Sequence, residues 1–241
     1  MVRSGILWLM ALALFLISSR ICIGREVFLK EDGNIYYKDD SGKVSQVTKE
    51  GKDHSAVLSP DQKTIYFVRL IKDLKDNPEG VTDLHDWGYF AGMFWSPDEI
   101  WRVNTDGTDS RPIIRNSYDL QRSREEDYLG WFGSLYVSKD GRKIYFLSQD
   151  SVTGAILYAA DVDGKNIKKI ERAHGLDQVA GRDDPYLGYL IAHVKRYPEE
   201  TGVTKWTSVL IDLDDHEMME IEDLKAFCLE HKCESDHSPN L

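Results

Sequence analysis

A pair of β-hairpins recurs along this chain, and no other feature of the sequence restricts its fold as strongly. The first hairpin of each pair consists of a short strand, a tight polar turn and a second strand rich in the aromatic and β-branched residues that favour strands. It is found at residues 56–69, 135–148 and, in a more divergent form, 179–192. In the two clearest copies the turns Ser-Pro-Asp (59–61) and Ser-Lys-Asp (138–140) precede Ile-Tyr-Phe at the same distance. The copies therefore represent one repeated structural unit.

A second hairpin follows each copy of the first, and its turn contains Asp followed by Gly, Asp or Ser. The copies lie at residues 99–115, 155–170 and 208–221, and an unpaired one lies at 33–47. Gly, and less readily Asp and Asn, adopt the backbone angles that a tight hairpin needs. Two hairpins in a repeat of about 40 to 50 residues are typical of a four-stranded propeller blade. A β-sandwich stays open as an alternative, although it does not explain recurrence at a fixed offset.

The motifs of the repeat also resemble those of a known family. Ser-Pro-Asp-x-Lys-x-Ile-Tyr-Phe (59–67), followed by Ile-Trp-x-Val-x-x-Asp-Gly (100–107), is similar to the repeat of TolB-type β-propellers, periplasmic or secreted relatives of the WD-repeat propellers. The resemblance covers roughly residues 27–221, about three and a half to four repeats. It implies an all-β propeller fold of about four blades, which we expect to be followed by a short C-terminal helix.

The chain departs from the family pattern in several places. Gln62 stands where the family usually has a turn Gly, Lys139 replaces the usual Pro, and the divergent copy keeps only Asp184-Pro185 and Tyr189. Typical members have six or seven blades, so this chain is short for a closed ring of that type. A four-bladed ring, an open or incomplete arc, and a ring completed by a second copy in a homo-oligomer are all compatible with the sequence.

The first 24 residues have the composition of a secretory signal peptide. Arg3 gives a basic start, residues 5–17 form an uncharged apolar run, and Cys22 and Gly24 occupy the small-residue positions before a cut after Gly24. A membrane-spanning helix needs about 20 apolar residues, so we expect cleavage and a periplasmic or secreted location without a stable membrane span. A retained anchor is the alternative. The chain then divides into a signal peptide (1–24), a TolB-like propeller (25–221) and a C-terminal helix and tail (222–241).

The charge of the chain excludes one class of partner. The sequence has 30 Lys and Arg against 41 Asp and Glu, a net charge of −11. The signal segment carries Arg3 and Arg20 but no acidic residue, so cleavage leaves 28 basic residues and a net charge of −13. Because affinity for nucleic acids comes mainly from Lys and Arg that neutralise phosphates, we expect no nucleic-acid binding. The acidity favours a partner with basic patches or one that is bound through aromatic contacts.

Two cysteines remain after cleavage, Cys228 and Cys233. An even pair in an exported chain indicates a disulfide. Side chains five positions apart on a continuous helix point in different directions, so a helix in this region must end before Cys233. A zinc site that adds His231 and His237 is the alternative, but its spacing is not a usual one. The face of the expected helix consists of Ile221, Leu224, Phe227 and Cys228.

The surplus length of the chain is concentrated in the loops at one end of the expected blades. Because antiparallel strands alternate in direction, the b–c loops (70–97 and 195–207) and the d–a loops (116–130 and 171–178) lie at the same end. Loops on a rigid scaffold often carry binding residues, and aromatic residues near Arg are typical of interaction hot spots. The alternative is that the aromatic residues extend the strands and pack against a neighbouring blade. The candidate binding residues are Trp87, Tyr89, Phe90, Trp95, Arg122 and Arg124.

Motifs of catalysis are absent from the sequence. It contains no Gly-x-Ser-x-Gly, no His-Glu-x-x-His and no glycine-rich phosphate loop. We therefore predict no catalytic residue, no metal ligand and no cofactor, and a non-enzymatic scaffold that binds a protein or cell-envelope partner through its long loops. The alternative is a carbohydrate lyase or hydrolase of propeller type with a central site of histidine and acidic residues. The scattered histidines that this alternative would use are His54, His85, His174 and His193.

Overall fold

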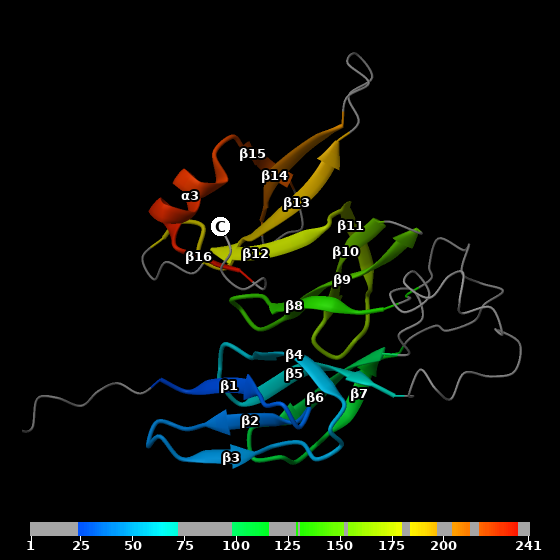
Figure 1. Cartoon of the computed structure of the whole chain (residues 1–241), viewed down its shortest axis with the longest axis vertical. Coiled ribbons are helices and arrows are strands. Elements are labelled where there is room, and N and C mark those ends of the chain that lie inside the picture. Colours follow the sequence, from blue (N-terminus) through cyan, green and yellow to red (C-terminus); the bar gives the residue numbers. More distant parts are fainter. Residues whose placement is uncertain are drawn as a thin grey trace, which may run out of the picture.

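The computed structural model describes residues 24–71, 98–115, 129, 131–151, 154–179, 184–196, 204–212 and 217–235. These residues form four antiparallel sheets that follow one another along the long axis of the molecule, with the first and fourth sheets at opposite ends (Figure 1). The stack confirms the predicted all-β propeller fold of about four blades, as an open arc with a short C-terminal helix. The predicted signal peptide, apart from Gly24, lies outside the described residues.

Each sheet is built from strands that are consecutive in the sequence. The first sheet consists of β1 (Glu26–Leu29), β2 (Ile35–Lys38) and β3 (Val44–Gln46). The second consists of β4 (Asp53–Leu58), β5 (Thr64–Leu70), β6 (Asp98–Asn104) and β7 (Arg111–Ile114). The third consists of β8 (Gly133–Val137), β9 (Lys143–Ser151), β10 (Gly154–Asp161) and β11 (Lys168–Arg172). The fourth contains β12 (Gly175–Val179), β13 (Leu190–Arg196), β14 (Lys205–Ile211) and β15 (Glu217–Ile221), and a fifth strand, β16 (Cys233–Ser235), beside β12. Across the described part of the chain, no helix is long and apolar enough to span a membrane.

The repeated Ser-x-Asp motif fixes the turn between the first two strands of a blade. In the second sheet the Ser59 hydroxyl donates to the Asp61 carboxylate at 2.6 Å and accepts from the Thr64 amide at 3.0 Å. The third sheet repeats both contacts with Ser138, at 2.6 Å to Asp140 and 2.9 Å from the Lys143 amide. The hydroxyl of Ser138 is the main cause that lowers the pKa of Asp140 to about 2. The motif therefore satisfies polar backbone groups that a tight turn would leave unpaired.

Apolar side chains fill the spaces between successive sheets. One cluster lies between the first and second sheets and includes Ile35 and Phe67, and another lies between the second and third and includes Phe146. A third cluster, with Leu157 and Val209, joins the third and fourth sheets. The order of the core clusters follows the order of the sheets, so each sheet depends on its neighbours for burial, as in other repeat folds.

A helix covers part of the last sheet. Helix α3 (Leu224–His231) begins at the N-cap Asp223, whose carboxylate accepts from the Ala226 amide, and it ends before the left-handed Lys232. A disulfide joins Cys228 to Cys233, as predicted, with the helix ending between them. Phe227 is buried in a cluster against the strands of the fourth sheet. Strand β16, which follows the disulfide, is not predicted by the sequence pattern.

The boundaries predicted for the divergent copy are wrong. The sequence pattern starts its first strand at Val179, whereas β12 ends there, and the expected d–a loop 171–178 is largely strand. The reason is a longer turn, in which the Leu187 amide donates to the Asp184 carbonyl and the Tyr189 amide to the Tyr186 carbonyl. This turn shifts the second strand of the hairpin to Leu190–Arg196.

Candidate binding site

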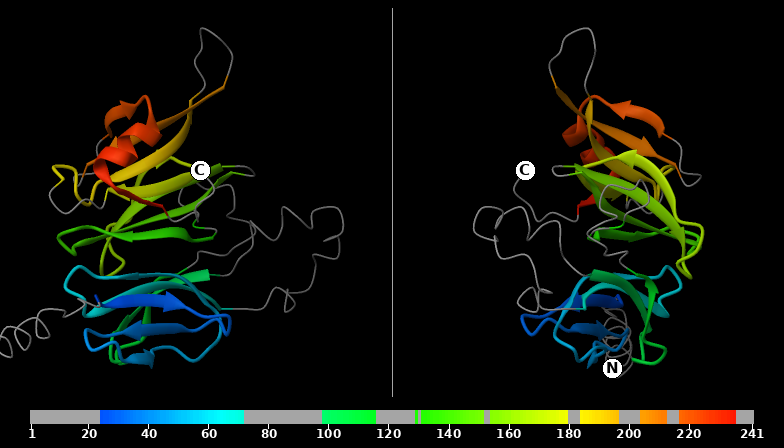
Figure 2. Two further views of the ribbon diagram at one scale, coloured as in Figure 1. Left: turned by 60° about the vertical axis from the view of Figure 1, so that its left-hand side comes forward. Right: turned by 90° about the vertical axis from the view of Figure 1, so that its right-hand side faces the viewer.

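The outer face of the fourth sheet is divided into a covered and an open half. Side chains alternate between the faces of a strand, so Ile191 and His193 of β13 share the outer face with Ser208 and Leu210 of β14. Ile191 and Leu210 lie under α3 in the apolar cluster. The open half lies toward the ends of the strands where β13 finishes and β14 begins (Figures 1 and 2). It contains His193 and Ser208.

Three polar side chains on neighbouring strands form a hydrogen-bonded chain in the open half. His193 Nε2 lies 2.9 Å from Asp177 Oδ2 on β12, and His193 Nδ1 lies 2.9 Å from Ser208 Oγ on β14. Asp177 and Ser208 are buried, whereas 27% of the His193 side chain is exposed. Gly175 is paired with His193, and a Cβ at this glycine would lie 3.2 Å from the imidazole. The glycine therefore leaves the space in which the ring is held between its two partners.

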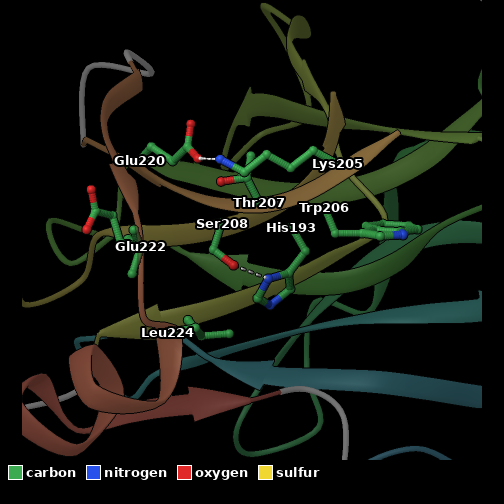
Figure 3. Close-up of a pocket in the computed structure, with 9 residues that line it drawn as sticks. His193, Lys205, Trp206, Thr207, Ser208, Glu220, Glu222 and Leu224 are labelled. Atoms are coloured by element: carbon green, nitrogen blue, oxygen red, sulfur yellow. Dashed lines mark hydrogen bonds and ion pairs between the residues drawn. The ribbon is translucent and has the colours of Figure 1, made fainter. Parts of the chain in front are cut away.

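A pocket with a volume of about 790 Å³ opens beside this chain. Such a volume lies within the range of about 300–1,000 Å³ that is typical of sites for small ligands. By the same alternation, Lys205, Thr207 and Glu220 lie on the opposite face of β14 and β15 from Trp206 and Ser208, because Glu220 pairs with the inward-facing Val209. There Lys205 Nζ is 2.5 Å from Glu220 Oε1, and this contact, followed by one from the Thr207 hydroxyl, lowers the pKa of Glu220. Figure 3 shows the indole of Trp206 and the carboxylate of Glu222 on opposite sides of the His193–Ser208 pair. The residues that line the pocket are His193, Lys205, Trp206, Thr207, Ser208, Glu220, Ile221, Glu222 and Leu224.

Trp206 is the most exposed aromatic residue of the site, with 59% of its surface accessible. The ring of His174 packs edge-on against the indole at a centroid distance of 4.9 Å. Lys195 Nζ lies 5.8 Å from the centre of the indole. Burial, together with the positive charges of Lys195 and Arg172, lowers the pKa of His174. His174 is therefore neutral at pH 7 and supports the indole as an uncharged ring.

The Asp177–His193–Ser208 chain has the residue types of a nucleophile, a base and an orienting carboxylate. Acyl transfer also requires donors directed at the developing oxyanion. The cation that lines the pocket, Lys205, is paired with Glu220. The arrangement therefore favours binding, because its polar groups are held in fixed positions beside an exposed aromatic ring. Within the described ranges, no three His, Cys, Asp or Glu side chains are grouped so that they could hold a metal ion.

The residues predicted from the long loops cannot be compared with this site. Trp87, Tyr89, Phe90, Trp95, Arg122 and Arg124 all lie outside the described residues, as does His85. Of the other histidines, His54 lies in the second sheet, 3.7 Å from the buried Asp98, and His174 and His193 lie at the fourth. Of these scattered histidines, His193 therefore belongs to the candidate site on the outer face of the fourth sheet.

Sequence reasoning missed most of this site. Asp177 falls in the expected d–a loop, and Lys205 and Trp206 fall in the expected b–c loop, whereas all three belong to strands. One feature of the sequence could have indicated the site. Asp177, His193 and Ser208 are polar residues in strands that are otherwise largely apolar, and each occupies an outward position of its strand. The pairing register was needed to bring them together.

Comparison with known proteins supports the fold. No family model and no curated protein matches the chain. The dipeptidyl peptidase 4 of Porphyromonas gingivalis matches with a TM-score of 0.50 and 13% identity, over 83% of this chain and 31% of that one. A putative TolB from Agrobacterium tumefaciens matches with a TM-score of 0.40 and 21% identity, over 63% and 46%. The β-propeller domain of the Trilobed protease from Pyrococcus furiosus matches with a TM-score of 0.43 and 15% identity, over 81% and 51%.

The chain thus spans less than two thirds of the length of each of these structures. At such low identities the likeness concerns the fold alone.

Proposed function

We propose that this chain is an exported, non-enzymatic propeller scaffold that binds a protein or another component of the cell envelope. Binding takes place at the end of the sheets where β13 finishes and β14 begins. The observation that carries this proposal is Trp206, which is 59% exposed beside a pocket at that end of the fourth sheet. An exposed indole loses little conformational entropy on binding and buries a large apolar area, and tryptophan is accordingly enriched at binding hot spots.

The loop residues belong to the same proposed surface. The described strands that flank the long b–c loop, β5 and β6, pair Leu70 with Asp98 at their ends. By strand alternation this end corresponds to the end of the fourth sheet at which Arg196 pairs with Lys205. We therefore propose that the segments that carry Trp87 and Arg122 contribute to the same partner surface as Trp206. The Cys228–Cys233 disulfide supports export, because disulfides persist mainly in oxidising compartments.

Affinity capture from an envelope extract tests the scaffold. The wild-type chain is compared with Trp206→Ala, with the double variant Trp87→Ala and Tyr89→Ala, and with the control Leu229→Ala, which removes a side chain that is 77% exposed on α3. We expect the first two to lose the same captured component while the control keeps it. Unchanged circular dichroism and melting temperature show that the variants are folded. Equal capture by all four proteins would contradict the proposal.

A second candidate is an enzyme that acts on carbohydrate, and the Asp177–His193–Ser208 chain is the observation that favours it. The test is release of reducing ends from soluble polysaccharides. Turnover that disappears in both His193→Ala and Ser208→Ala, with the fold retained, would replace the scaffold by an enzyme. Turnover that survives both substitutions would assign it to another site or to a contaminant.

A further inference from the structure

The pocket of the fourth sheet lies where β14 has a neighbouring strand on one side only. Strand β14 pairs with β13 along its whole length. On its other side, pairing with β15 starts only at Ser208, opposite Ile221, the last residue of β15. The chain then leaves the sheet, because Asp223 is the N-cap of α3. The residues of β14 that precede Ser208 thus form an open edge among the described residues, namely Lys205, Trp206 and Thr207.

The lining of the pocket is the one that an unpaired strand edge presents. Successive side chains of a strand point to opposite faces of the sheet, so a pocket on one face would be lined by every second residue. This pocket is instead lined by the four consecutive residues 205–208 of β14. Trp206 and Ser208 belong to the outer face, whereas Lys205 and Thr207 belong to the inner face. The pocket is therefore the vacant place beside β14 into which β15 does not extend.

The open edge directs backbone hydrogen-bonding groups into this place. In an antiparallel sheet, alternate residues turn their N–H and C=O groups to opposite neighbours. At least one residue of the open edge therefore points both groups away from β13 and toward the pocket. Among the described residues, no backbone group bonds to the open edge from that side. Unpaired N–H and C=O groups at a strand edge are a template for another strand, so an extended peptide is the ligand that satisfies both.

The side chains on the two faces of the open edge determine which strand fits. On the outer face the indole of Trp206 is 59% exposed, although the ring of His174 packs against it. On the inner face Lys205 and Glu220 already form an ion pair at 2.5 Å. Side chains directly opposite each other on neighbouring strands are in contact, and aromatic pairs or aromatic and β-branched pairs stabilise the sheet. The residue opposite Trp206 should therefore be apolar, and the residues on either side of it should be polar.

We infer that the open edge binds an extended segment of a protein partner as an added strand. The segment lies beside residues 205–207, continues the line of β15 and places an apolar side chain against Trp206 (Figure 3). Strand addition to an exposed sheet edge is a general mode of peptide recognition, in which main-chain hydrogen bonds give affinity and alternate side chains give specificity. This inference rests on the proposed scaffold function and specifies how the protein partner is held.

Selection of peptides tests the inference. A displayed library of random heptapeptides is selected on the wild-type chain, and the strongest binder is synthesised with acetylated and amidated ends. We expect its sequence to contain an aromatic or aliphatic residue between two polar ones. Its affinity, measured by isothermal titration calorimetry, should fall at least tenfold for Trp206→Ala and less than twofold for the control Leu229→Ala. Because Trp206 is exposed, an unchanged circular dichroism spectrum should verify the fold of the variant.

Methylation of the peptide backbone distinguishes an added strand from other bound conformations. Alternate N–H groups of a strand point to opposite edges, and only one edge of the peptide can face β14. N-methylation of one set of alternate residues should therefore weaken binding at least tenfold, whereas N-methylation of the other set should change it less than twofold. Bound peptide should also protect at least one amide of residues 205–207 from hydrogen exchange.

The inference is overturned if no selected peptide depends on Trp206, or if both N-methylated peptides bind alike. Sedimentation that shows the wild type to dimerise through Trp206 would make a second copy the occupant and would also overturn it. Trp206-dependent capture of an envelope component that no selected peptide displaces would refute the added strand and leave the scaffold intact. Peptide binding as expected, without any capture from the extract, would refute the envelope scaffold alone. Absence of both kinds of binding would refute both proposals.

Discussion

The two ends of the stack hide their outer faces by different means. At the first sheet the side chains cover one another: Phe28 stacks on Tyr36 at 6.0 Å, and Lys30 Nζ lies 3.8 Å from the centre of the Tyr36 ring. At the fourth sheet an added helix covers the apolar half and buries Phe227. The helix leaves the other half open, and His193, Ser208 and the exposed Trp206 lie there. A terminal sheet that is covered by a separate element can therefore retain an open site beside that element.

The difference also concerns where stability resides. The contacts of the first end are made by partly exposed side chains, which contribute little individually. The contacts of the fourth end are apolar, mostly buried and closed by a disulfide. Changes at the fourth end should accordingly have larger effects than matched changes at the first.

The largest effect is expected for Phe227→Ala. Loss of this buried ring removes the main contact of α3 with the sheet, and such truncations cost about 3 kcal/mol. Phe28→Ala, which truncates the partly exposed ring of the first sheet, should cost about 1 kcal/mol or less. Urea unfolding measures both changes in the free energy of unfolding. Similar costs for the two variants would mean that the ends are equally dependent on apolar packing.

Replacement of both Cys228 and Cys233 by Ser should have the next largest effect. The bridge closes a short segment, and the chain-entropy argument gives about 2 kcal/mol for such a loop. We expect amides of α3 and β16 to lose protection from hydrogen exchange while those of β2 and β3 keep it. Equal loss of protection at the first sheet would show that the disulfide stabilises the whole stack and not one end.

A smaller effect is expected at the contact between α3 and the turn of the fourth sheet. His231 Nδ1 lies 2.7 Å from Asp184 Oδ2, and both side chains are mostly buried. Burial alone would raise the pKa of Asp184, but hydrogen bonds from the Tyr186 amide and from His231 outweigh it and hold the pKa below its ordinary value. Such a carboxylate stabilises the fold above the pKa of the unfolded chain, and this stabilisation is lost as the pH falls through the folded pKa.

Asp184→Asn should therefore cost about 1 kcal/mol at neutral pH, the size of one hydrogen bond. It should also reduce the loss of stability that the wild type shows below about pH 4, where aspartate titrates. Urea unfolding between pH 7 and pH 3 measures both. A variant that loses stability on acidification as steeply as the wild type would show that Asp184 does not stabilise the docked helix through its charge.

Much of the fold follows from local sequence signals. Ser59 and Asp61 repeat as Ser138 and Asp140 because the same hydrogen bonds close the same turn, so the motif predicts both the hairpin and its position. The disulfide is predicted for a similar reason, since its two cysteines are close in sequence.

The rest depends on contacts between distant residues. Strand β16 pairs with β12 across more than 50 positions, from Val179 to Cys233, and its sequence carries no strand pattern. The candidate site requires Asp177, His193 and Ser208 to be aligned across three strands, which is a matter of register. A register shift of one residue would turn His193 to the other face. The polar residues of the site can be recognised in the sequence, but it cannot be predicted from the sequence that they lie next to one another in the fold.

The smallest effect is expected for Tyr36→Phe at the first sheet. The Tyr36 hydroxyl donates to Asp32 Oδ2 at 2.8 Å and is the main cause that lowers the pKa of this exposed aspartate. Removal of the hydroxyl should raise the pKa of Asp32 toward its ordinary value, as measured by NMR titration of its carboxyl carbon. The aromatic ring, its stacking on Phe28 and the contact with Lys30 remain, so the melting temperature should not change measurably. A clear fall in melting temperature would mean that the first end depends on this hydrogen bond as the fourth end depends on its helix, and the contrast between the two ends would then be lost.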